Sequence, residues 1–194
     1  MKIAMTGWGG FLSTKLREQT AVTWTEDFNN SDALLLMGSP TFTAKELSIH
    51  DAQVMHQYVR ETIKMIDRYS GHIIFASTTG VNDIELDHTG STHYNLGKLF
   101  LENYILNEAD SCSILRIGTI VSDDPKDIAA MKPDRIQPQL LQGIVTAEWK
   151  DHYLMVDDFV SVTLDAILNK KTGIIEYPLI ELNLAQLKKI TLAV

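Results

Sequence analysis

The sequence predicts a doubly wound α/β fold, in which a parallel sheet is covered by helices on both faces. Short segments that are largely apolar, as expected of strands buried on both faces, occur at 2–6, 33–37 and 72–76. Segments whose apolar residues have helical spacing alternate with them, and the clearest runs over 45–69. Apolar strands that alternate with helices are typical of a sheet with two covered faces.

The other elements follow in the same rhythm. A glycine-rich turn and a helix over 11–19 come after the first strand, and a second strand is expected over 21–25. A turn at 27–31 precedes the strand at 33–37, which Gly38-Ser39-Pro40 stops. The long helix ends at Gly71. The later elements are a helix over 94–107, a strand over 113–117, a helix capped by Asp157-Asp158 and running to Asn169, a strand over 174–177 and a weaker helix after Ile180.

One stretch lies outside this rhythm and bears on domain organisation. Residues 122–155 hold three of the five prolines among mixed charges. We interpret the chain as one domain over 1–194, with 122–155 and the C-terminal segment as a small region that covers the carboxyl edge of the sheet. Ligands of doubly wound folds bind at that edge.

Composition excludes several classes of function. The 194 residues are 45% hydrophobic and 22% charged, which is too apolar for a disordered chain. The net charge of −8 gives no electrostatic footprint for nucleic acid or an anionic membrane. Cys112 has no second cysteine to pair with, the N-terminus lacks a signal-peptide pattern, and no apolar stretch approaches the roughly 20 residues of a spanning helix. We therefore expect a cytoplasmic protein.

The glycine-rich turn indicates dinucleotide binding. Residues 6–13 read TGWGGFLS, in which Gly7 can make the tight turn and Gly10 lets a pyrophosphate approach the backbone closely. The N–H groups and the positive dipole end of the next helix favour an anion there. An acid about 20 residues further on would bind the ribose hydroxyls, and both Glu26 and Asp27 are candidates. Such an acid favours NAD over NADP without excluding NADP.

A second motif places a phenol and an ammonium on one helix face. Tyr94 and Lys98 are four residues apart. A tyrosine carries protons poorly at neutral pH, but a neighbouring cation favours its phenolate. Hydroxyl groups at Ser77, Thr78 and Thr79 end the strand at 72–76, where a carbonyl or alcohol substrate would need a donor. An ordinary amphipathic helix would explain the pair alone, but not the pair together with these hydroxyls.

With these residues in place, the chain resembles the short-chain dehydrogenase/reductase superfamily, and within it the extended branch of sugar-nucleotide epimerases and dehydratases. Five motifs occur in the family's order: the TGxxGxxG turn at 6–13, the strand end at 76–81, YxxxK at Tyr94 and Lys98 with Glu102 following, LRIG at 115–118, and MVDDF at 155–159. The resemblance implies a Rossmann-like sheet.

The resemblance also implies a chemistry. Tyr94 acts as general base and then acid, Thr78 hydrogen-bonds the reacting sugar oxygen, and Lys98 binds the cofactor ribose and tunes Tyr94. Hydride passes to NAD to give a keto-sugar, which an epimerase reduces on the other face and a dehydrogenase releases. Residues expected at the cofactor are Thr6, Gly7, Trp8, Gly9, Gly10, Phe11, Leu12, Glu26, Asp27, Gly38, Ser39, Ala76, Ser77, Tyr94, Lys98 and Ile117. Residues expected at the nucleotide sugar are Thr79, His93, Thr119, Arg135 and Trp149.

The chain departs from the family pattern in places that concern the substrate. Ser13 replaces the third glycine, Thr119 stands at the usual asparagine, and Ser122 stands at a usual glycine. Only about two dozen residues separate Gly7 from the strand at 33–37, so a helix and a strand of the family fold look pruned. The sugar and its nucleotide are therefore open, as is the choice between epimerase, dehydratase and reductase.

Alternatives remain beside this interpretation. The histidines lack metal-ligand spacing, so no metal site is predicted. The nucleophile elbow of a Ser-His-Asp hydrolase is missing from the sequence. A second hypothesis is a dinucleotide sensor or scaffold that keeps the fold without turnover. The helix at 94–108 carries apolar residues on more than one side, and together with the helix at 45–69 it favours a homodimer through a helix bundle.

Overall fold

A computed structural model describes residues 1–40, 49–82, 84, 90–133, 135–144 and 150–192. The chain divides into two compact units. The first comprises Met1–Arg116 and Thr163–Glu176, and the second comprises Ile117–Val162 and Tyr177–Val194. Each unit has its own sheet, so the two are described separately.

The first unit is built on a six-stranded sheet of order β2-β1-β3-β4-β5-β8. Its register pairs Ile3 with both Trp24 and Ala33, and the pairs β1–β2, β1–β3, β3–β4 and β5–β8 are parallel. The strand order reverses beside β1, so the carboxyl ends of β1 and β3 form the switch point where doubly wound folds bind ligands. The strands are β1 (Lys2–Met5), β2 (Thr23–Thr25), β3 (Ala33–Leu36), β4 (His72–Thr78), β5 (Cys112–Ile117) and β8 (Gly173–Glu176).

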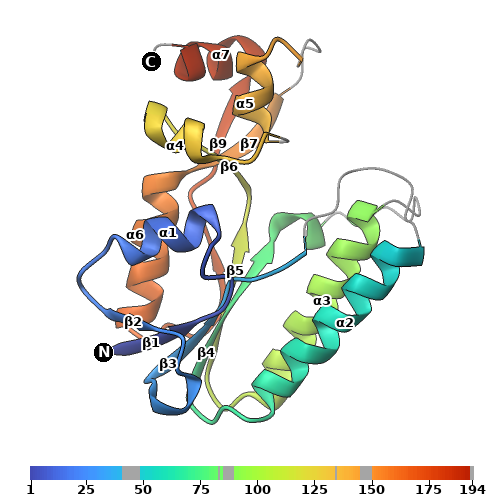
Figure 1. Ribbon diagram of the computed structural model, residues 1–194, viewed down its shortest axis with the longest axis vertical. Coiled ribbons are helices and arrows are strands. Elements are labelled where there is room, and N and C mark those ends of the chain that lie inside the picture. The colour runs from blue at the N-terminus through green and yellow to red at the C-terminus, as the bar shows by residue number, and fades with distance from the viewer. Residues whose placement is uncertain (41–48, 83, 85–89, 134, 145–149, 193–194) are drawn as a thin grey trace. The chain divides into compact units, whose positions relative to one another are not determined.

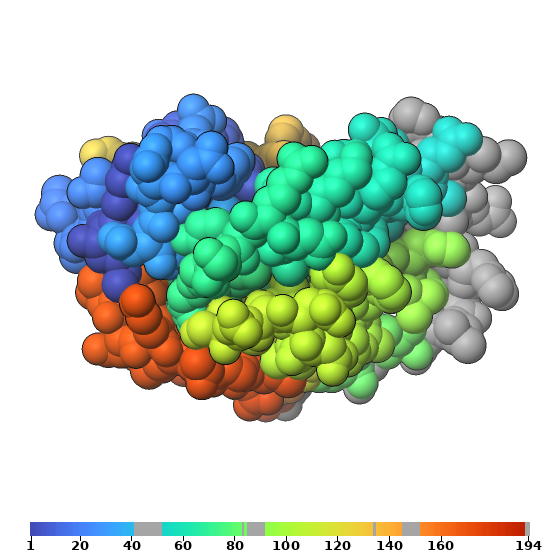
Figure 2. Space-filling view, turned by 90° about the horizontal axis from the view of Figure 1, so that it is seen from below, coloured from blue at the N-terminus to red at the C-terminus, as the bar shows by residue number. Residues whose placement is uncertain are grey.

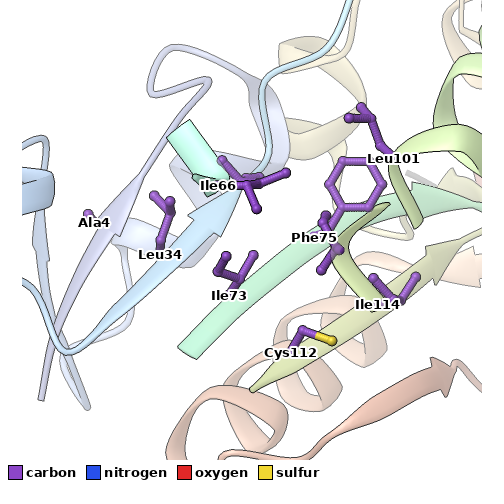
Figure 3. Packing of buried hydrophobic residues seen from close by; sticks show 10 residues of the cluster. Ala4, Leu34, Ile66, Ile73, Phe75, Leu101, Cys112 and Ile114 are labelled. Atoms are coloured by element: carbon purple, nitrogen blue, oxygen red, sulfur yellow. The ribbon is translucent and has the colours of Figure 1, made fainter. Parts of the chain in front are cut away.

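Helices cover both faces of this sheet, which confirms the predicted doubly wound class (Figure 1). On one side lie α2 (Ile49–Ile66) and α3 (Gly90–Glu108), and on the other lies α1 (Phe11–Arg17). Alternate residues of four strands pack under α2 and α3, and Figure 3 shows Phe75 of β4 beside Leu101 of α3. The core under these helices consists of Ala4, Leu34, Leu36, Ile66, Ile73, Phe75, Leu101, Ile105, Cys112 and Ile114.

The expected pruning of the first half is confirmed. Between β2 and β3 the chain forms only the short 3-10 helix η1 (Phe28–Asn30). Since no helix and strand are inserted there, β2 becomes the edge of the sheet. A second 3-10 helix, η2 (Thr79–Val81), directly follows the carboxyl end of β4.

The two long helices of the first unit lie side by side on its surface (Figure 2). Gly97 of α3 faces Met55 of α2 so closely that a Cβ at residue 97 would overlap the end of the methionine side chain. The helices therefore approach closely where α3 carries the Tyr94–Lys98 pair. Among the described residues, no helix is both long enough and apolar enough to cross a membrane.

The second unit has a three-stranded sheet of order β6-β7-β9 that the sequence did not reveal. Its strands are β6 (Thr119–Val121), β7 (Lys150–Met155) and β9 (Ile180–Asn183), and its helices are α4 (Pro125–Ala130), α5 (Ile136–Leu141), the start of α6 (Val156–Leu168) and α7 (Leu184–Leu192). Leu140, Tyr153 and Leu187 are buried in its core. Gln137 joins its polar interior by hydrogen bonds to the Ser122 backbone and to the Thr191 hydroxyl.

One prediction in this region is wrong, and one strand was missed. Asp157 and Asp158 do not cap α6, because the helix begins at Val156 directly after β7 and both acids lie inside its first turn. There their negative charges still interact favourably with the positive end of the helix dipole. The expected helix after Ile180 is present as α7, but the sequence did not reveal strand β9 before it, whose residues Ile180–Asn183 pair antiparallel with β7. That pairing is long-range, and local spacing does not report it.

His72 ties the amino ends of three strands together, at the edge of the sheet opposite the switch point. Its Nδ1 lies 2.7 Å from the Ser111 hydroxyl and its Nε2 lies 2.9 Å from the Ser113 hydroxyl. The Ser113 hydroxyl in turn donates to the backbone oxygen of Lys171, just before β8. Burial, with the positive charge of Lys170, lowers the pKa of His72. The folded protein therefore holds a neutral imidazole here.

We expect His72 to make folding stability depend on pH. Because its folded pKa lies below its usual value near 6.5, the unfolded chain binds the proton more readily, and stability falls as pH drops below that value. His72→Gln keeps a neutral donor and acceptor without the titration. Urea unfolding should therefore show that the wild type loses more free energy of unfolding between pH 8 and pH 5 than His72→Gln does.

His56→Gln is the matched control, since His56 lies exposed on α2. It should leave the pH dependence of the wild type unchanged. A His72→Gln protein whose stability follows the wild-type curve through the same pH range would contradict the role assigned to His72.

Candidate functional site

The carboxyl ends of β1 and β3 meet at two glycines. Gly7 has a φ of +67°, in the left-handed region that side chains with a Cβ rarely adopt. A Cβ on Gly7 would lie 2.6 Å from the Cα and backbone N of Gly38. The Gly38 N–H donates to the Thr6 hydroxyl at 3.0 Å, which holds the two chain ends together. Glycine is thus required at Gly7 both by its dihedral angle and by the close approach.

In the rest of the glycine-rich turn, Gly9 has free space around it among the described atoms, and Trp8 is held by a residue of α1. A Cβ on Gly9 would meet no described atom within 4 Å. Gly10 precedes α1 without a side-chain cap from the described residues. The Arg17 guanidinium lies 4.7 Å from the Trp8 ring and donates to the Trp8 backbone oxygen at 3.1 Å. The last turn of α1 therefore fixes the shape of the loop.

The two acids that follow β2, Glu26 and Asp27, have different surroundings in the structure. The Asp27 carboxylate accepts hydrogen bonds from the Asn29 backbone N–H at 3.1 Å and from the Asn30 side chain at 2.8 Å. The Asn30 bond lowers the pKa of Asp27. Asp27 thus caps η1, whereas Glu26 is exposed directly after the strand. Of the two alternatives, Glu26 is the better candidate for ribose hydroxyls.

Hydroxyl groups gather where β4 ends. Ser77 is only 4% exposed, and its hydroxyl has no hydrogen-bond partner in the described part of the chain. The Thr78 hydroxyl accepts from the Gly80 N–H at 3.2 Å, which leaves its own hydrogen available to donate. Asn95 of α3 lies against Gly80, where a Cβ would come within 2.7 Å of its amide. This contact sets α3 against the end of β4.

Tyr94 lies beside the end of β3. Its hydroxyl is 3.4 Å from the hydroxyl of Ser39, the residue after Gly38. The approach of Gly7 to Gly38 and the contact of Ser39 with Tyr94 thereby join the turn after β1, the turn after β3 and the N-terminal part of α3. These contacts bring together Gly7, Gly38, Ser39 and Tyr94, all within the first unit.

Lys98 is buried in a cage of rings and oxygen atoms. Its side chain belongs to a residue that is 1% exposed, and its Nζ donates to the Ala76 backbone oxygen at 2.7 Å and to the Tyr58 hydroxyl at 3.1 Å. The same Nζ lies 4.6 Å from the Phe75 ring centre and 5.6 Å from that of Tyr94. The ammonium thus interacts with ring faces as well as with oxygen acceptors.

Burial changes the titration of this cage. Desolvation lowers the pKa of Lys98 to about 7. The negative charge of the Glu102 carboxylate opposes this effect and raises the pKa. Burial also raises the pKa of Tyr58, as does the negative charge that Tyr94 would carry. Tyr58 therefore stays a neutral phenol, while Lys98 can change its charge near neutral pH.

Glu102 links this cage to the next strand. Glu102 is 1% exposed, and its carboxylate pairs with the Arg116 guanidinium at 2.7 Å. Arg116 also donates to the Asn82 side-chain oxygen at 2.7 Å. The buried carboxylate is thus compensated from β5, as a buried charge must be. The resulting row of charges is Lys98, Glu102 and Arg116.

The remaining predicted site residues lie in several places. Thr79 begins η2, and His93 precedes Tyr94 on α3. Ile117, Thr119 and Arg135 belong to the second unit, where Thr119 begins β6 and Arg135 precedes α5. Trp149 lies outside the described residues. Within the described ranges, no group of three or more histidine, cysteine, aspartate or glutamate side chains could hold a metal ion.

Sequence reasoning missed Tyr58. It lies on the inward stripe of α2 with Met55, Thr62 and Ile66, at helical spacing. The stripe contains two hydroxyl-bearing residues among apolar ones. A polar side chain on a buried helix face needs a hydrogen-bond partner, and this was the available signal.

Comparison with solved structures identifies the architecture. UDP-N-acetylglucosamine 4-epimerase from Bacillus cereus superposes with a TM-score of 0.69 at 16% identity, covering 97% of this chain and 79% of the epimerase. The chain therefore has the same fold as that epimerase. UDP-glucuronic acid 4-epimerase from Bacillus cereus, in complex with NAD, gives a TM-score of 0.67 at 14% identity, covering 96% and 80%.

A third structure extends the same likeness. RMD from Pseudomonas aeruginosa, complexed with NADPH, gives a TM-score of 0.67 at 14% identity, covering 98% of this chain and 82% of RMD. No protein-family model and no curated protein matches the sequence. The likeness therefore rests on the fold, since every identity is low.

The glycine contact predicts a sharp difference between two alanine variants. Gly7→Ala places a Cβ against Gly38 and forces a left-handed dihedral, so we expect a loss of about 2–5 kcal/mol in the free energy of unfolding. Gly9→Ala, in the same turn, meets open space and should change stability by about 1 kcal/mol or less. Urea denaturation measures both. Equal stabilities for the two variants would contradict the close approach.

Proposed function

We propose that this chain is an NAD(P)-dependent enzyme that oxidises and reduces a nucleotide-activated sugar, as an epimerase or reductase. The observation that carries the proposal is the contact between the Tyr94 and Ser39 hydroxyls, 3.4 Å apart. Ser39 follows Gly38, which packs on Gly7 of the glycine-rich turn. The expected proton carrier is therefore beside the expected dinucleotide turn.

Several features of the first unit fit a dinucleotide. Gly7 approaches Gly38 without a Cβ between them, and a Cβ on Gly9 would meet no described atom within 4 Å. The buried Ser77 hydroxyl lacks a partner among the described residues, and a bound polar group would supply one. Glu26, exposed after β2, is available for ribose hydroxyls. Gly7, Gly9, Ser77 and Glu26 would thus hold the cofactor.

The chain's own residues supply the proton chemistry. When bound, a nicotinamide group accepts hydride from the sugar and can return it. Tyr94 takes the proton from the reacting hydroxyl and later gives it back. Lys98, charged and held near the Tyr94 ring, favours the phenolate form that can take this proton. Thr78, whose oxygen accepts from Gly80, donates its hydrogen to the reacting sugar oxygen.

The substrate class rests on the structural neighbours. The two Bacillus cereus proteins are named for 4-epimerisation of UDP-N-acetylglucosamine and UDP-glucuronic acid. A solved structure of WbmF from Bordetella bronchiseptica holds NAD+ and UDP. These names support a nucleotide sugar as the substrate of this fold, with Thr79 and His93 as candidate contacts in the first unit. Thr119, Arg135 and Trp149 are the further candidates.

Released cofactor and a tyrosine variant test the function together. We expect protein purified without heating, then denatured, to release NAD(H) or NADP(H), detected by mass spectrometry. Tyr94→Phe should release the same dinucleotide, yet turn over a panel of UDP-, dTDP-, GDP- and ADP-sugars at least about 100-fold more slowly than the wild type.

Each result of this experiment decides something. A protein that neither releases nor binds NAD(H) or NADP(H) would exclude the proposal. Wild-type protein that binds dinucleotide but turns over no sugar would favour the sensor or scaffold hypothesis. Equal turnover by Tyr94→Phe and wild type would exclude Tyr94 as the proton carrier.

We also propose that two copies associate through α2 and α3, which lie together on one face (Figure 2). On α3, Leu96 is 39% exposed and Phe100, one turn later, is 53% exposed. Large apolar side chains in successive turns favour burial against another surface. The outer side of α2 is more polar, with His56, Arg60 and Lys64 exposed. The contact would therefore centre on α3.

Phe100→Asp tests the association. A charge at the centre of an apolar contact costs desolvation energy, so light scattering should show a dimeric wild type and a monomeric Phe100→Asp protein. Lys64→Asp, on the outer side of α2, is the control and should stay dimeric. A monomeric wild type at micromolar concentration would overturn the proposal.

A further inference from the structure

We propose that Tyr58 is a positioning residue that keeps Lys98 charged and fixed beside Tyr94. This inference deepens the proposed function, on which its catalytic meaning rests. The carrying observation is the hydrogen bond of 3.1 Å from Lys98 Nζ to the Tyr58 hydroxyl. Tyr58 comes from α2, whereas Tyr94 and Lys98 both belong to α3. The helix that carries the pair therefore depends on its neighbour for an acceptor.

The groups around Lys98 divide by what they can do for an ammonium. From β4, the Ala76 backbone oxygen accepts a hydrogen bond at 2.7 Å, and the Phe75 ring lies 4.6 Å away. From α3, Glu102 attracts the charge through space, but it is paired with Arg116 of β5. Within the described structure, Tyr58 is the one side chain that accepts a hydrogen bond from Lys98.

The phenol differs from the carbonyl in one chemical respect. A carbonyl oxygen only accepts, whereas a phenol can accept from an ammonium or donate to a neutral amine. Tyr58 can therefore keep Lys98 hydrogen-bonded in either protonation state, so the Lys98 nitrogen keeps this partner when its charge changes. The burial that raises the pKa of Tyr58 keeps its proton on the phenol throughout.

The consequence concerns the pH range in which Tyr94 has a cation beside it. Desolvation brings the pKa of Lys98 down to about 7, so its charge is already marginal at neutral pH. Removing an acceptor from an ammonium destabilises the charged form further. Without the Tyr58 hydroxyl, Lys98 would lose its charge at a lower pH, and the support for a Tyr94 phenolate would end there as well.

The close packing of α2 on α3 makes this arrangement rigid. Gly97, next to Lys98, leaves room for Met55, which precedes Tyr58 by one helical turn on α2. A Cβ at Gly97 would overlap the terminal methyl group of Met55, so the methionine, one helical turn away from the phenol, would have to move. The absence of a side chain at Gly97 therefore lets Met55 pack on α3 beside the hydrogen bond.

Tyr58→Phe is the direct test, read by NMR titration of lysine side chains in the ligand-free protein. The Lys98 signal is assigned by its loss in Lys98→Met. We expect a wild-type midpoint near 7 and a midpoint lower by about one pKa unit in Tyr58→Phe, a tenfold change in the acid dissociation constant. Tyr104→Phe is the matched control, because the Tyr104 hydroxyl of α3 bonds Asp67, the residue directly after α2, at 2.6 Å.

The outcomes separate positioning from packing. A lowered midpoint in Tyr58→Phe with an unchanged one in Tyr104→Phe supports the inference. An unchanged midpoint in Tyr58→Phe, or equal shifts in both variants, overturns it. If Tyr58→Phe does not fold, 4-methylphenylalanine at position 58 provides a second variant of nearly the same size. Its methyl group fills the place of the hydroxyl but accepts no hydrogen bond, so it should also lower the Lys98 midpoint.

The titration is independent of the proposed function. It needs no cofactor, so the Lys98 result stands even for a protein that binds no dinucleotide. Conversely, the protein could release dinucleotide while Tyr58→Phe leaves the Lys98 midpoint unchanged. That result would support the proposed function and overturn this inference. Where turnover is found, Tyr58→Phe should also move the pH profile of kcat to lower pH, which a loss of packing alone would not do.

Discussion

The close approach of Gly7 to Gly38 is the constraint on which the site depends. Two parallel strands that leave a sheet in neighbouring positions normally carry side chains that hold their ends apart. Here both positions lack a Cβ, and the Thr6 hydroxyl bridges the remaining gap to the Gly38 backbone. This approach positions Ser39, which in turn reaches Tyr94. A change of geometry at the two glycines would therefore extend to a side chain more than 50 residues further along the chain.

Electrostatics supply the second constraint. A lysine that is buried as deeply as Lys98 keeps its charge only through specific partners. The structure surrounds it with a carbonyl, a phenol and aromatic faces, and sets the Glu102–Arg116 pair one turn further along α3. The result is an ammonium that responds to small changes in its surroundings. A group of this kind suits a site in which protons move near neutral pH.

The sequence predicted the first unit well because its signals are local. The apolar strands, the glycine turn after β1 and the Tyr94–Lys98 spacing all lie within short windows, and the sheet brings them to one edge by its parallel topology. The three-stranded sheet of the second unit was missed because β7 and β9 pair across more than 20 residues. Asp157 and Asp158 look like caps in sequence, yet β7 continues into α6 without a break. Tyr58 was missed because its role needs the packing of α2 on α3.

The short strands at both edges of the six-stranded sheet have a consequence for aggregation. A sheet edge presents unpaired backbone groups that can template the addition of a strand from another molecule. Here the sheet ends in β2, with three residues, on one side and in β8, with four, on the other. Edges this short give a foreign strand little length to pair with. The six-stranded sheet therefore ends in edges that do not invite edge-to-edge aggregation.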